Sequence, residues 1–341
     1  MNFPFQISLR TVVISVITFL VFVSGFVFLH DALVSADAFK GFAPQLFLAA
    51  MAAHAATLGL NSVRLSHSLS LHGDVRRFPS LRQMTDAMVL HNFLVSFLPA
   101  RMADGYYPFL IARRAQVSVG AGLGNLLVIR IFDVMAISVI LAALAPLAYA
   151  GAELERFYRV VIPLVLALIV AAARIDLLLG IALALFQSTL HRFALGRKVS
   201  RTINQARHWT SQLTTRQRIE LGLISLVPWL ASGFTYLFAI EAVGIDIGWA
   251  EAILAGKLAE IGAALPIQAA GGIGAGEGMM AAMLVGLGLP LAAAGLAALG
   301  VRFLILGVVA GIFAIRSLVV LTFAERDGTS ILGRIFGPDR I

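Results

Sequence analysis

Residues 117–149 read VSVGAGLGNLLVIRIFDVMAISVILAALAPLAY, and this apolar run decides the class of the fold. A helix needs about 20 apolar residues to cross the hydrocarbon of a bilayer. This run exceeds that length, although it contains Arg130 and Asp133. Similar runs occur along the whole chain, at Thr11–Leu29, Phe42–Leu60, Tyr158–Phe186, Ile219–Ile240, Gly248–Leu265, Ala275–Leu289 and Leu291–Ile315. The sequence therefore predicts an all-α, polytopic integral membrane protein, a helix bundle of about eight spans.

The composition supports this class of protein. Of the 341 residues, 60% are hydrophobic and only 13% are charged, whereas soluble domains carry about 25% charged residues. The net charge of +8 could indicate nucleic-acid binding, but the basic residues lie between the apolar runs and are better interpreted as topology signals. The chain has no Cys, so thiol chemistry and disulfides are excluded.

Basic residues predict the orientation of the chain. Four arginines follow the second apolar run, beginning at Arg64, and further groups lie at 113–114, within 187–218 and at the end of the chain. Loops rich in Lys and Arg lie on the cytoplasmic side of membranes. We therefore expect an inner-membrane protein with both termini cytoplasmic. Segment 187–218 is expected to be a cytoplasmic connector, with Trp209 near the membrane interface.

The whole chain, residues 1–341, is expected to form a single transmembrane domain. The run Thr11–Leu29 is longer than the roughly 7–15-residue core of a secretory signal, so we expect it to be a retained anchor. Met84–Leu98 is too short to span comfortably and is expected to enter and leave by the cytoplasmic face. The sequence contains no signal for the oligomeric state.

Two polar elements interrupt the apolar sequence. Residues 91–105 read HNFLVSFLPARMADG and carry Asn92, Arg101 and Asp104 around a proline. Proline ends or kinks a helix, and non-helical backbone at membrane depth is tolerated only inside protein or beside a water-filled cavity. Arg101 and Asp104 are three residues apart, so they can pair on one helical face.

The second element, residues 265–278, reads LPIQAAGGIGAGEG. Its glycines predict an unwound turn that leads into a short helix, whose free amides would form an anion-binding corner. Both elements combine an apolar helix, a proline, an irregular stretch and an acid. Paired broken segments in two halves of a chain are typical of a transporter site. An inverted repeat of halves 1–150 and 151–341 is therefore expected, with one or two re-entrant or broken helices.

Charges inside apolar runs are candidates for function because charge at membrane depth is costly. Arg130 and Asp133 are spaced to neutralise each other, as are Lys257 and Glu260. Arg302 has no partner nearby in the sequence, and we expect Glu277 to be its distant partner. His54 and His67 show no ligand spacing with a carboxylate and are interpreted as structural.

These motifs resemble the flippase-like transmembrane family, whose members include the membrane region of lysylphosphatidylglycerol synthase. The family's first motif has the form N-x(4–5)-P-[GA]-R-x-G-E, followed by a basic stretch and E-R-x-x-D. This chain carries, in the same order, Asn92, Pro99, Ala100, Arg101, Asp104, Arg113, Arg114, Arg130 and Asp133. The second motif, P-x-x-x-G-G-x-G-x-x-E with a later arginine, is matched by Pro266, Gly271, Gly272, Gly274, Glu277 and Arg302.

The first motif departs from the family pattern, whereas the second is nearly complete. Asp104 replaces the usual Glu, Ala103 replaces Gly, Ile129 replaces an acid, and Tyr107 stands where members often carry Arg. The resemblance extends from about Phe42 to Arg316. These 341 residues hold no polar region large enough for the aminoacyl-transfer domain of the full synthase. The resemblance therefore implies a lipid flippase or lipid-linked transporter.

The predicted function is movement of a lipid, or a lipid-like amphiphile, between leaflets. The candidate substrate-binding residues are Asn92, Arg101, Asp104, Arg130, Asp133, Gln268, Gly271, Gly272, Gly274, Glu277 and Arg302. The alternatives are a secondary transporter of a small solute and a membrane-embedded transferase acting on lipid-linked substrates. An enzyme is less favoured because the sequence shows no metal-ligand spacing and no His pair with an acid. Membrane lipids are the expected partners, with no cofactor, metal or nucleic acid.

Overall fold

In a computed structural model of the protein, the described residues are 42–71, 78–98, 102–149, 151–190, 194–264 and 273–326, with residues 13, 16–21 and 24. This part of the chain folds into helices, which confirms the predicted polytopic helix bundle. They are α2 (Pro44–Ser70), α3 (Leu81–Phe97), α4 (Met102–Ala115), α5 (Val119–Ala148), α6 (Gly151–Ala173), α7 (Ile175–Leu190), α8 (Ala194–Ser211), α9 (Thr215–Ala242), α10 (Trp249–Ala264), α11 (Ala275–Gly286) and α12 (Leu291–Arg326).

Side-chain caps explain where several of these helices begin. Ser80 accepts a hydrogen bond from the backbone N–H of Gln83, and the Gln83 side chain bonds back to the N–H of Ser80. Thr214 and Gln217 form the same reciprocal pair at the start of α9. Such capping boxes satisfy backbone donors that a helix start leaves free. They fix the entry points of α3 and α9, two helices that line the candidate site.

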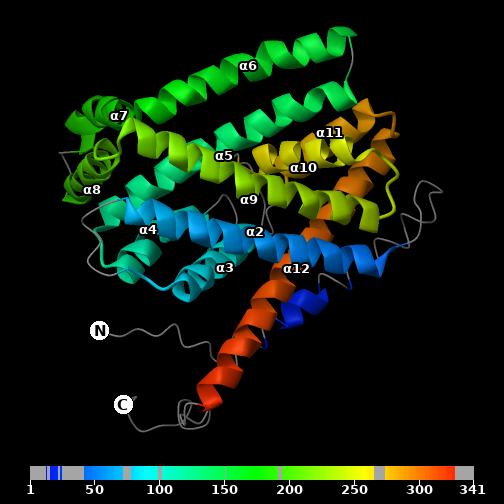
Figure 1. Cartoon of the computed structure of the whole chain (residues 1–341), viewed down its shortest axis with the longest axis horizontal. Helices are drawn as coiled ribbons and strands as arrows, with labels where there is room; N and C mark the ends of the chain where they lie inside the picture. The colour runs from blue at the N-terminus through cyan, green and yellow to red at the C-terminus, as the bar shows by residue number, and fades with distance from the viewer. Residues whose placement is uncertain are drawn as a thin grey trace.

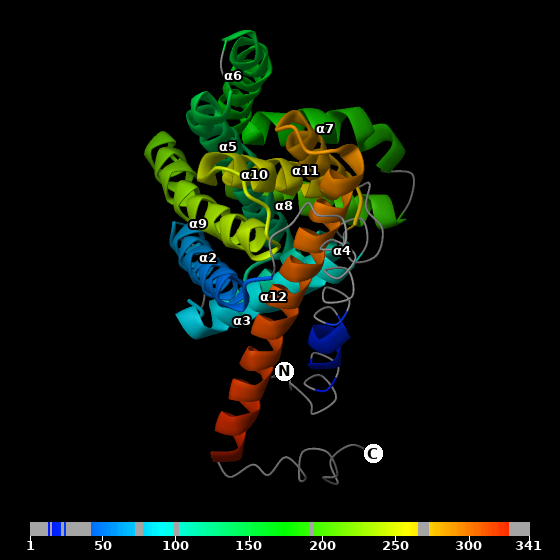
Figure 2. The same ribbon diagram turned by 90° about the vertical axis from the view of Figure 1, so that its right-hand side faces the viewer.

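Four helices form a layer, and a fifth crosses it. Figure 1 shows α2, α9, α5 and α6 side by side, and Figure 2 shows the same order from the end. Helix α12 crosses this layer steeply and extends beyond it. In the apolar window of α12, 72% of the residues are buried, against 11% in that of α6. The apolar window of α12 is therefore packed inside the bundle, and α6 presents an apolar face to the surroundings.

Five described helices are long and apolar enough to cross a membrane: α2, α5, α9, Leu154–Ala173 of α6 and Leu291–Val319 of α12. The predicted run Thr11–Leu29 lies largely outside the described residues. The runs Gly248–Leu265 and Ala275–Leu289 form α10 and α11, which have 16 and 12 residues and are shorter than the roughly 20 needed to span. These two helices correspond to shorter apolar pieces between the full spans.

The predicted run Tyr158–Phe186 forms two helices, because α6 ends at Ala173 and α7 begins at Ile175. The guanidinium of Arg218 donates hydrogen bonds to the carbonyl oxygens of Ala172 and Ala173, and it lies 3.6 Å from the carboxylate of Asp176. A cation at a helix C-terminus satisfies its free carbonyls and favours the helix dipole. Arg218 therefore stabilises the break, which explains the excess length of the run.

Segment 187–218 contains the amphipathic helix α8, which packs against α5 and α7. Trp209, which we expect near the membrane interface, is only 3% exposed. Its ring lies against Gly124 of α5, where a Cβ would be 3.0 Å from it. The small glycine therefore allows α8 to dock on the bundle, and Trp209 belongs to the core.

Each of the two predicted broken elements lies between two described helices. Helix α3 ends before residues 99–101, and α10 ends before 265–272, two gaps outside the described residues. In each case the next helix, α4 or α11, carries an acid in its first turn: Asp104 or Glu277. The inverted repeat of halves 1–150 and 151–341 remains a prediction.

Candidate functional site

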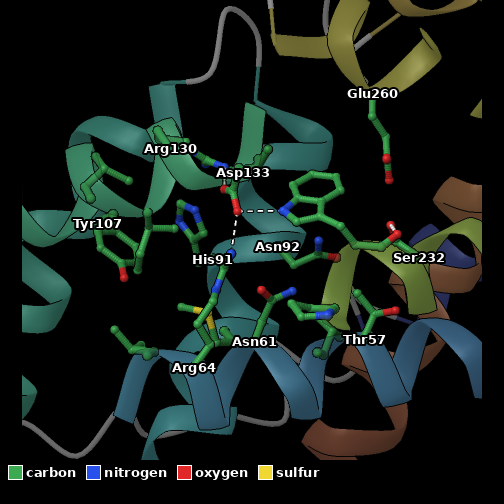
Figure 3. A pocket seen from close by; sticks show the side chains of 18 of the residues that line it. Thr57, Asn61, Arg64, His91, Asn92, Tyr107, Arg130, Asp133, Ser232 and Glu260 are labelled. Carbon is green, nitrogen blue, oxygen red and sulfur yellow. Dashed lines mark hydrogen bonds and ion pairs between the residues drawn. The ribbon is translucent and has the colours of Figure 1, made fainter. Parts of the chain in front are cut away.

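A polar cavity of about 200 Å³ lies where α2, α3, α4, α5, α9 and α10 meet. Figure 3 shows its labelled side chains converging from helices far apart in the sequence. The polar side chains in its lining are His54, Thr57, Asn61, Arg64, His91, Asn92, Tyr107, Arg130, Asp133, Trp229, Ser232 and Glu260. Polar groups inside a membrane bundle are costly, so their concentration here marks the candidate site.

Asp133 is the centre of the cavity's ionic network. One carboxylate oxygen accepts hydrogen bonds from Arg64 at 2.5 Å and from the indole N–H of Trp229 at 2.7 Å. The other lies 3.3 Å from Arg130, as the spacing of these two residues predicted. The Asp133 side chain is 5% exposed and that of Arg64 is 7% exposed. These buried charges are compatible with the apolar surroundings because they are paired and hydrogen-bonded.

Asp104 extends the network to α4. Its Oδ1 accepts a 2.6 Å hydrogen bond from Arg130 and lies 3.3 Å from Nε2 of His91. Burial opposes ionisation of Asp104, but the bonds from His91 and Arg130 outweigh it and hold the pKa of this carboxyl well below its usual range. Arg130 therefore bridges two carboxylates, one on its own helix and one in the first turn of α4.

A second ion pair lies at the α9–α10 side of the cavity. Nζ of Lys257 is 2.8 Å from Glu260, as their i,i+3 spacing predicted, and it also donates to the hydroxyl of Ser232. The same ammonium lies over the ring of Trp229, 5.1 Å from its centre. Trp229 thus contacts Lys257 through its ring and Asp133 through its N–H, which joins the two ionic groups.

Neutral polar pairs complete the lining. His54 and Asn92 are 3.1 Å apart between Nε2 and Oδ1, and join α2 to α3. The hydroxyl of Tyr107 donates to Asn125 at 3.0 Å, and Asn125 donates to Ser68 at 2.7 Å. The motif resemblance led us to expect an arginine at the position of Tyr107. At this position the chain therefore has a neutral donor in place of a further positive charge.

A smaller charged group lies between α11 and α12. Arg302 is 3.4 Å from Glu277, which confirms that these two residues are partners. Glu277 also accepts a 2.6 Å hydrogen bond from the backbone N–H of Gly274, whose φ of 154° favours glycine. A pocket of only about 10 Å³ adjoins this pair. Glu277 therefore caps the N-terminus of α11, and its ion pair with Arg302 links α11 to α12.

The structure divides the predicted site residues into groups. Three of them line the cavity: Asn92, Arg130 and Asp133. Asp104 does not line it but is ion-paired with Arg130, which does. Gly274, Glu277 and Arg302 lie together at the second, smaller group. Four of the predicted residues lie outside the described part of the chain: Arg101, Gln268, Gly271 and Gly272.

Several cavity residues were missed by sequence reasoning. Arg64 was assigned to a cytoplasmic loop, but it lies inside α2 and is ion-paired with Asp133. His54 was interpreted as structural, yet it lines the cavity with Asn61. The missed signal was spacing: positions 54, 61 and 64 fall on one face of a helix that continues past Leu60. Ser232 and Glu260 join the site only through tertiary packing.

The chemistry available is exchange of ionic and hydrogen-bond partners. Within the described ranges, no group of three His, Asp or Glu side chains is placed to hold a metal ion. The cavity instead offers arginines, carboxylates and the Asn92 amide, whose partners are other side chains. A bound polar group can replace those partners one at a time, so that buried charge is never left uncompensated.

The comparison with known proteins identifies the family. A family model described as the lysylphosphatidylglycerol synthase TM region matches residues 7–312. No curated protein and no solved structure matches the chain. The matched range includes the cavity network and the Glu277–Arg302 pair. It covers helices α2 to α11 and α12 as far as residue 312. The chain therefore belongs to the family of the lysylphosphatidylglycerol synthase membrane region, and is a multi-pass integral membrane protein related to membrane lipids.

Proposed function

We propose that this protein moves a lipid, or a lipid-like amphiphile, between the leaflets of the membrane. The observation that supports this is the polar cavity of about 200 Å³ enclosed by helices of a membrane bundle. A headgroup that crosses hydrocarbon loses its hydration, so the protein must supply substitute partners. Arg64, Arg130 and Asp133 supply both signs of charge, and Asn61 and Asn92 supply neutral donors and acceptors.

The ion pairs explain how the cavity stays stable when it is empty. Arg130 already has two carboxylate partners, and Asp133 has three donors. A lipid phosphate competes for the arginines, while a cationic or hydroxyl headgroup competes for the carboxylates. The protein exchanges partners and creates no isolated charge, which keeps the barrier to headgroup entry low.

The proposed location is the inner membrane, with both termini cytoplasmic. The support is the asymmetry of basic residues between connections. The described helices also place the exposed basic residues Arg201 and Arg216 at α8 and the start of α9. The sequence contains no cysteine, so the orientation can be tested with single cysteines introduced at either end. Their labelling by a membrane-impermeant thiol reagent reports which side each end faces, without background.

The test is leaflet exchange in liposomes. The purified protein is reconstituted with fluorescent lipids bearing zwitterionic, anionic or cationic headgroups, and exchange is followed by dithionite quenching. Arg130→Gln removes a cavity charge that bonds two carboxylates. The matched control is Arg159→Gln, because Arg159 is 71% exposed on α6 and, among the described residues, forms an ion pair with exposed Glu155 alone, at 2.6 Å. We expect exchange above empty liposomes that falls in Arg130→Gln and is unchanged in Arg159→Gln.

The same measurement separates the alternatives. Absence of exchange for every headgroup in a folded sample would contradict lipid transport. Uptake of a soluble solute that depends on Arg130 would then favour a secondary transporter. Turnover of a lipid-linked substrate without leaflet exchange would favour a membrane-embedded transferase.

A further inference from the structure

An apolar groove lies beside the polar cavity. It has a volume of about 390 Å³, larger than the cavity, and is formed by α2, α3 and α12. Its two polar side chains both have partners: the Thr85 hydroxyl bonds to the carbonyl of Leu81, and Arg316 is ion-paired with Asp86. The groove therefore offers a wall of aliphatic and methionine side chains with no free polar group in its lining.

Helix α2 presents one face to the apolar groove and an adjacent face to the polar cavity. Met51, Ala55 and Leu58 line the groove at spacings of four and three residues. An adjacent stripe of the same helix lines the cavity and carries His54, Asn61 and Arg64. Leu58 belongs to both linings. Residues at these spacings form adjacent stripes on a helix. One buried leucine side chain, 4% exposed, thus separates the polar space from the apolar one.

Helix α3 repeats the arrangement. Thr85 and Val89 face the groove, whereas Met88, His91 and Asn92 face the cavity. Both helices therefore carry a polar stripe and an apolar stripe side by side. Packing alone requires apolar stripes, but it does not require a polar cavity and an empty apolar groove on neighbouring faces of the same two helices.

From this juxtaposition we propose that the groove binds the acyl chain of the lipid whose headgroup occupies the cavity, with Leu58 as the partition between them. The inference rests on the proposed lipid transport and adds the tail-binding site and the route of entry between α2, α3 and α12. A diacyl or monoacyl phospholipid has the required form, a charged headgroup linked through glycerol to an aliphatic chain. The groove-lining residues Ile315 and Val319 are 55% and 38% exposed, so the groove is open at its side.

The exposure of the groove and its lack of unpaired polar groups favour an acyl chain over a protein segment. Lipid tails are as apolar as leucine side chains, so a groove in a membrane protein selects a tail by shape and by attachment to a bound headgroup. Binding at the groove is therefore expected to depend on the cavity, and binding at the cavity on the groove. This mutual dependence distinguishes one bound lipid from an unrelated annular lipid.

The experiment uses the full chain in nanodiscs of phosphatidylcholine. Two photoreactive phospholipids are compared, one with a diazirine at the end of an acyl chain and one with a diazirine on the headgroup. Adducts are mapped by mass spectrometry. We expect tail adducts in the groove to exceed those on the exposed face of α6, which reports annular lipid. Headgroup adducts are expected on the cavity segments of α2 and α3.

The decisive variant is Ala55→Trp, which fills the groove from a position that does not itself line the cavity. Its matched control is Ala56→Trp, because Ala56 is the next residue of α2, is also exposed, and lines neither space. Ala55→Trp should reduce tail adducts to the level of α6 and should also reduce the headgroup adducts. Ala52→Trp, on the same face, provides a second variant if the first does not fold.

Two results would overturn the inference: tail adducts in the groove no higher than on α6, or headgroup adducts unchanged when Ala55→Trp removes the tail adducts. Because the readout is binding, it is independent of transport. The expected adducts without leaflet exchange would contradict the proposed function and leave the lipid site standing. Leaflet exchange without groove adducts would contradict only the tail site.

Discussion

Replacing Asp133 by Asn is expected to destabilise the bundle more than any exchange of a surface charge. The substitution keeps the size of the side chain and an oxygen for the Trp229 N–H, but removes the negative charge that faces Arg64 and Arg130. Arg130 keeps Asp104 as a partner at 2.6 Å. Among the described residues, Arg64 has no other carboxylate within ion-pair distance, and its side chain is only 7% exposed.

The magnitude follows from this burial. Breaking a buried ion pair by removing one partner costs about 3–5 kcal/mol, because a buried charge is left uncompensated. Asp133→Asn and Arg64→Met are each expected to lower the free energy of unfolding by about that amount. The double variant removes both charges and should be more stable than the sum of the two losses predicts. Contacting residues of this kind show coupling energies of up to about 3 kcal/mol, and we expect about 2 kcal/mol.

The assay is reversible unfolding of the purified protein in mixed micelles, with the free energy of unfolding extracted for the wild type, both single variants and the double variant. Arg159→Gln serves as the control, because its pair with Glu155 is exposed and worth at most about 0.5 kcal/mol. If the loss of unfolding free energy in the double variant equals the sum of the two single losses within about 0.5 kcal/mol, direct coupling of Arg64 with Asp133 is refuted. A loss of under about 1 kcal/mol for Asp133→Asn would show that water reaches the network.

Three further perturbations have defined outcomes. Arg302→Ala and Glu277→Gln should each lower the midpoint of thermal unfolding, and the double variant should be little worse, because the two side chains are partners at 3.4 Å. Gly122→Ala should cost about 1–3 kcal/mol, since its Cβ would lie 2.5 Å from a backbone oxygen of α4, whereas Gly59→Ala meets open space and should cost nothing. For Asp104, whose pKa is depressed in the folded state, the ion pairs stabilise the protein above the ordinary carboxyl pKa of about 4. The difference in unfolding free energy between wild type and Asp104→Asn should therefore be fully present above the ordinary carboxyl pKa and shrink as the pH falls below about 4.

The helices could be predicted from the sequence because hydrophobicity and length dictate them locally. The run around Arg130 and Asp133 became α5, and the spacing of these residues correctly predicted their ion pair. The break between α6 and α7 could not be predicted in the same way. It depends on Arg218, which reaches the end of α6 from more than forty residues further along the chain.

The site was harder to predict because most of its contacts are long-range. Conspicuous intramembrane charges identified Asp133 and Arg130, but the partner of Asp133 on α2 was hidden by a positive-inside interpretation of Arg64. The rule for basic loops is statistical, and it fails for an arginine that finds a buried carboxylate. The local spacing of Lys257 and Glu260 predicted their ion pair, but no local pattern placed His91 or Glu260 beside Asp133. They become site residues only because α3 and α10 pack around α5 and α9.

The balance of charge in the cavity is itself an argument for reversible binding. Among the described residues, three Lys or Arg side chains and three carboxylates form the connected network in and around the cavity, namely Arg64, Arg130 and Lys257 with Asp104, Asp133 and Glu260. A site with an excess of one sign would hold an oppositely charged headgroup tightly, and release would then leave charge buried without a partner. A neutral network has the same net charge before and after a zwitterionic headgroup enters, so entry and release differ little in electrostatic free energy. A transporter needs weak, reversible occupancy of this kind. A site that only anchors a lipid would instead bind it more tightly with an excess of one sign of charge.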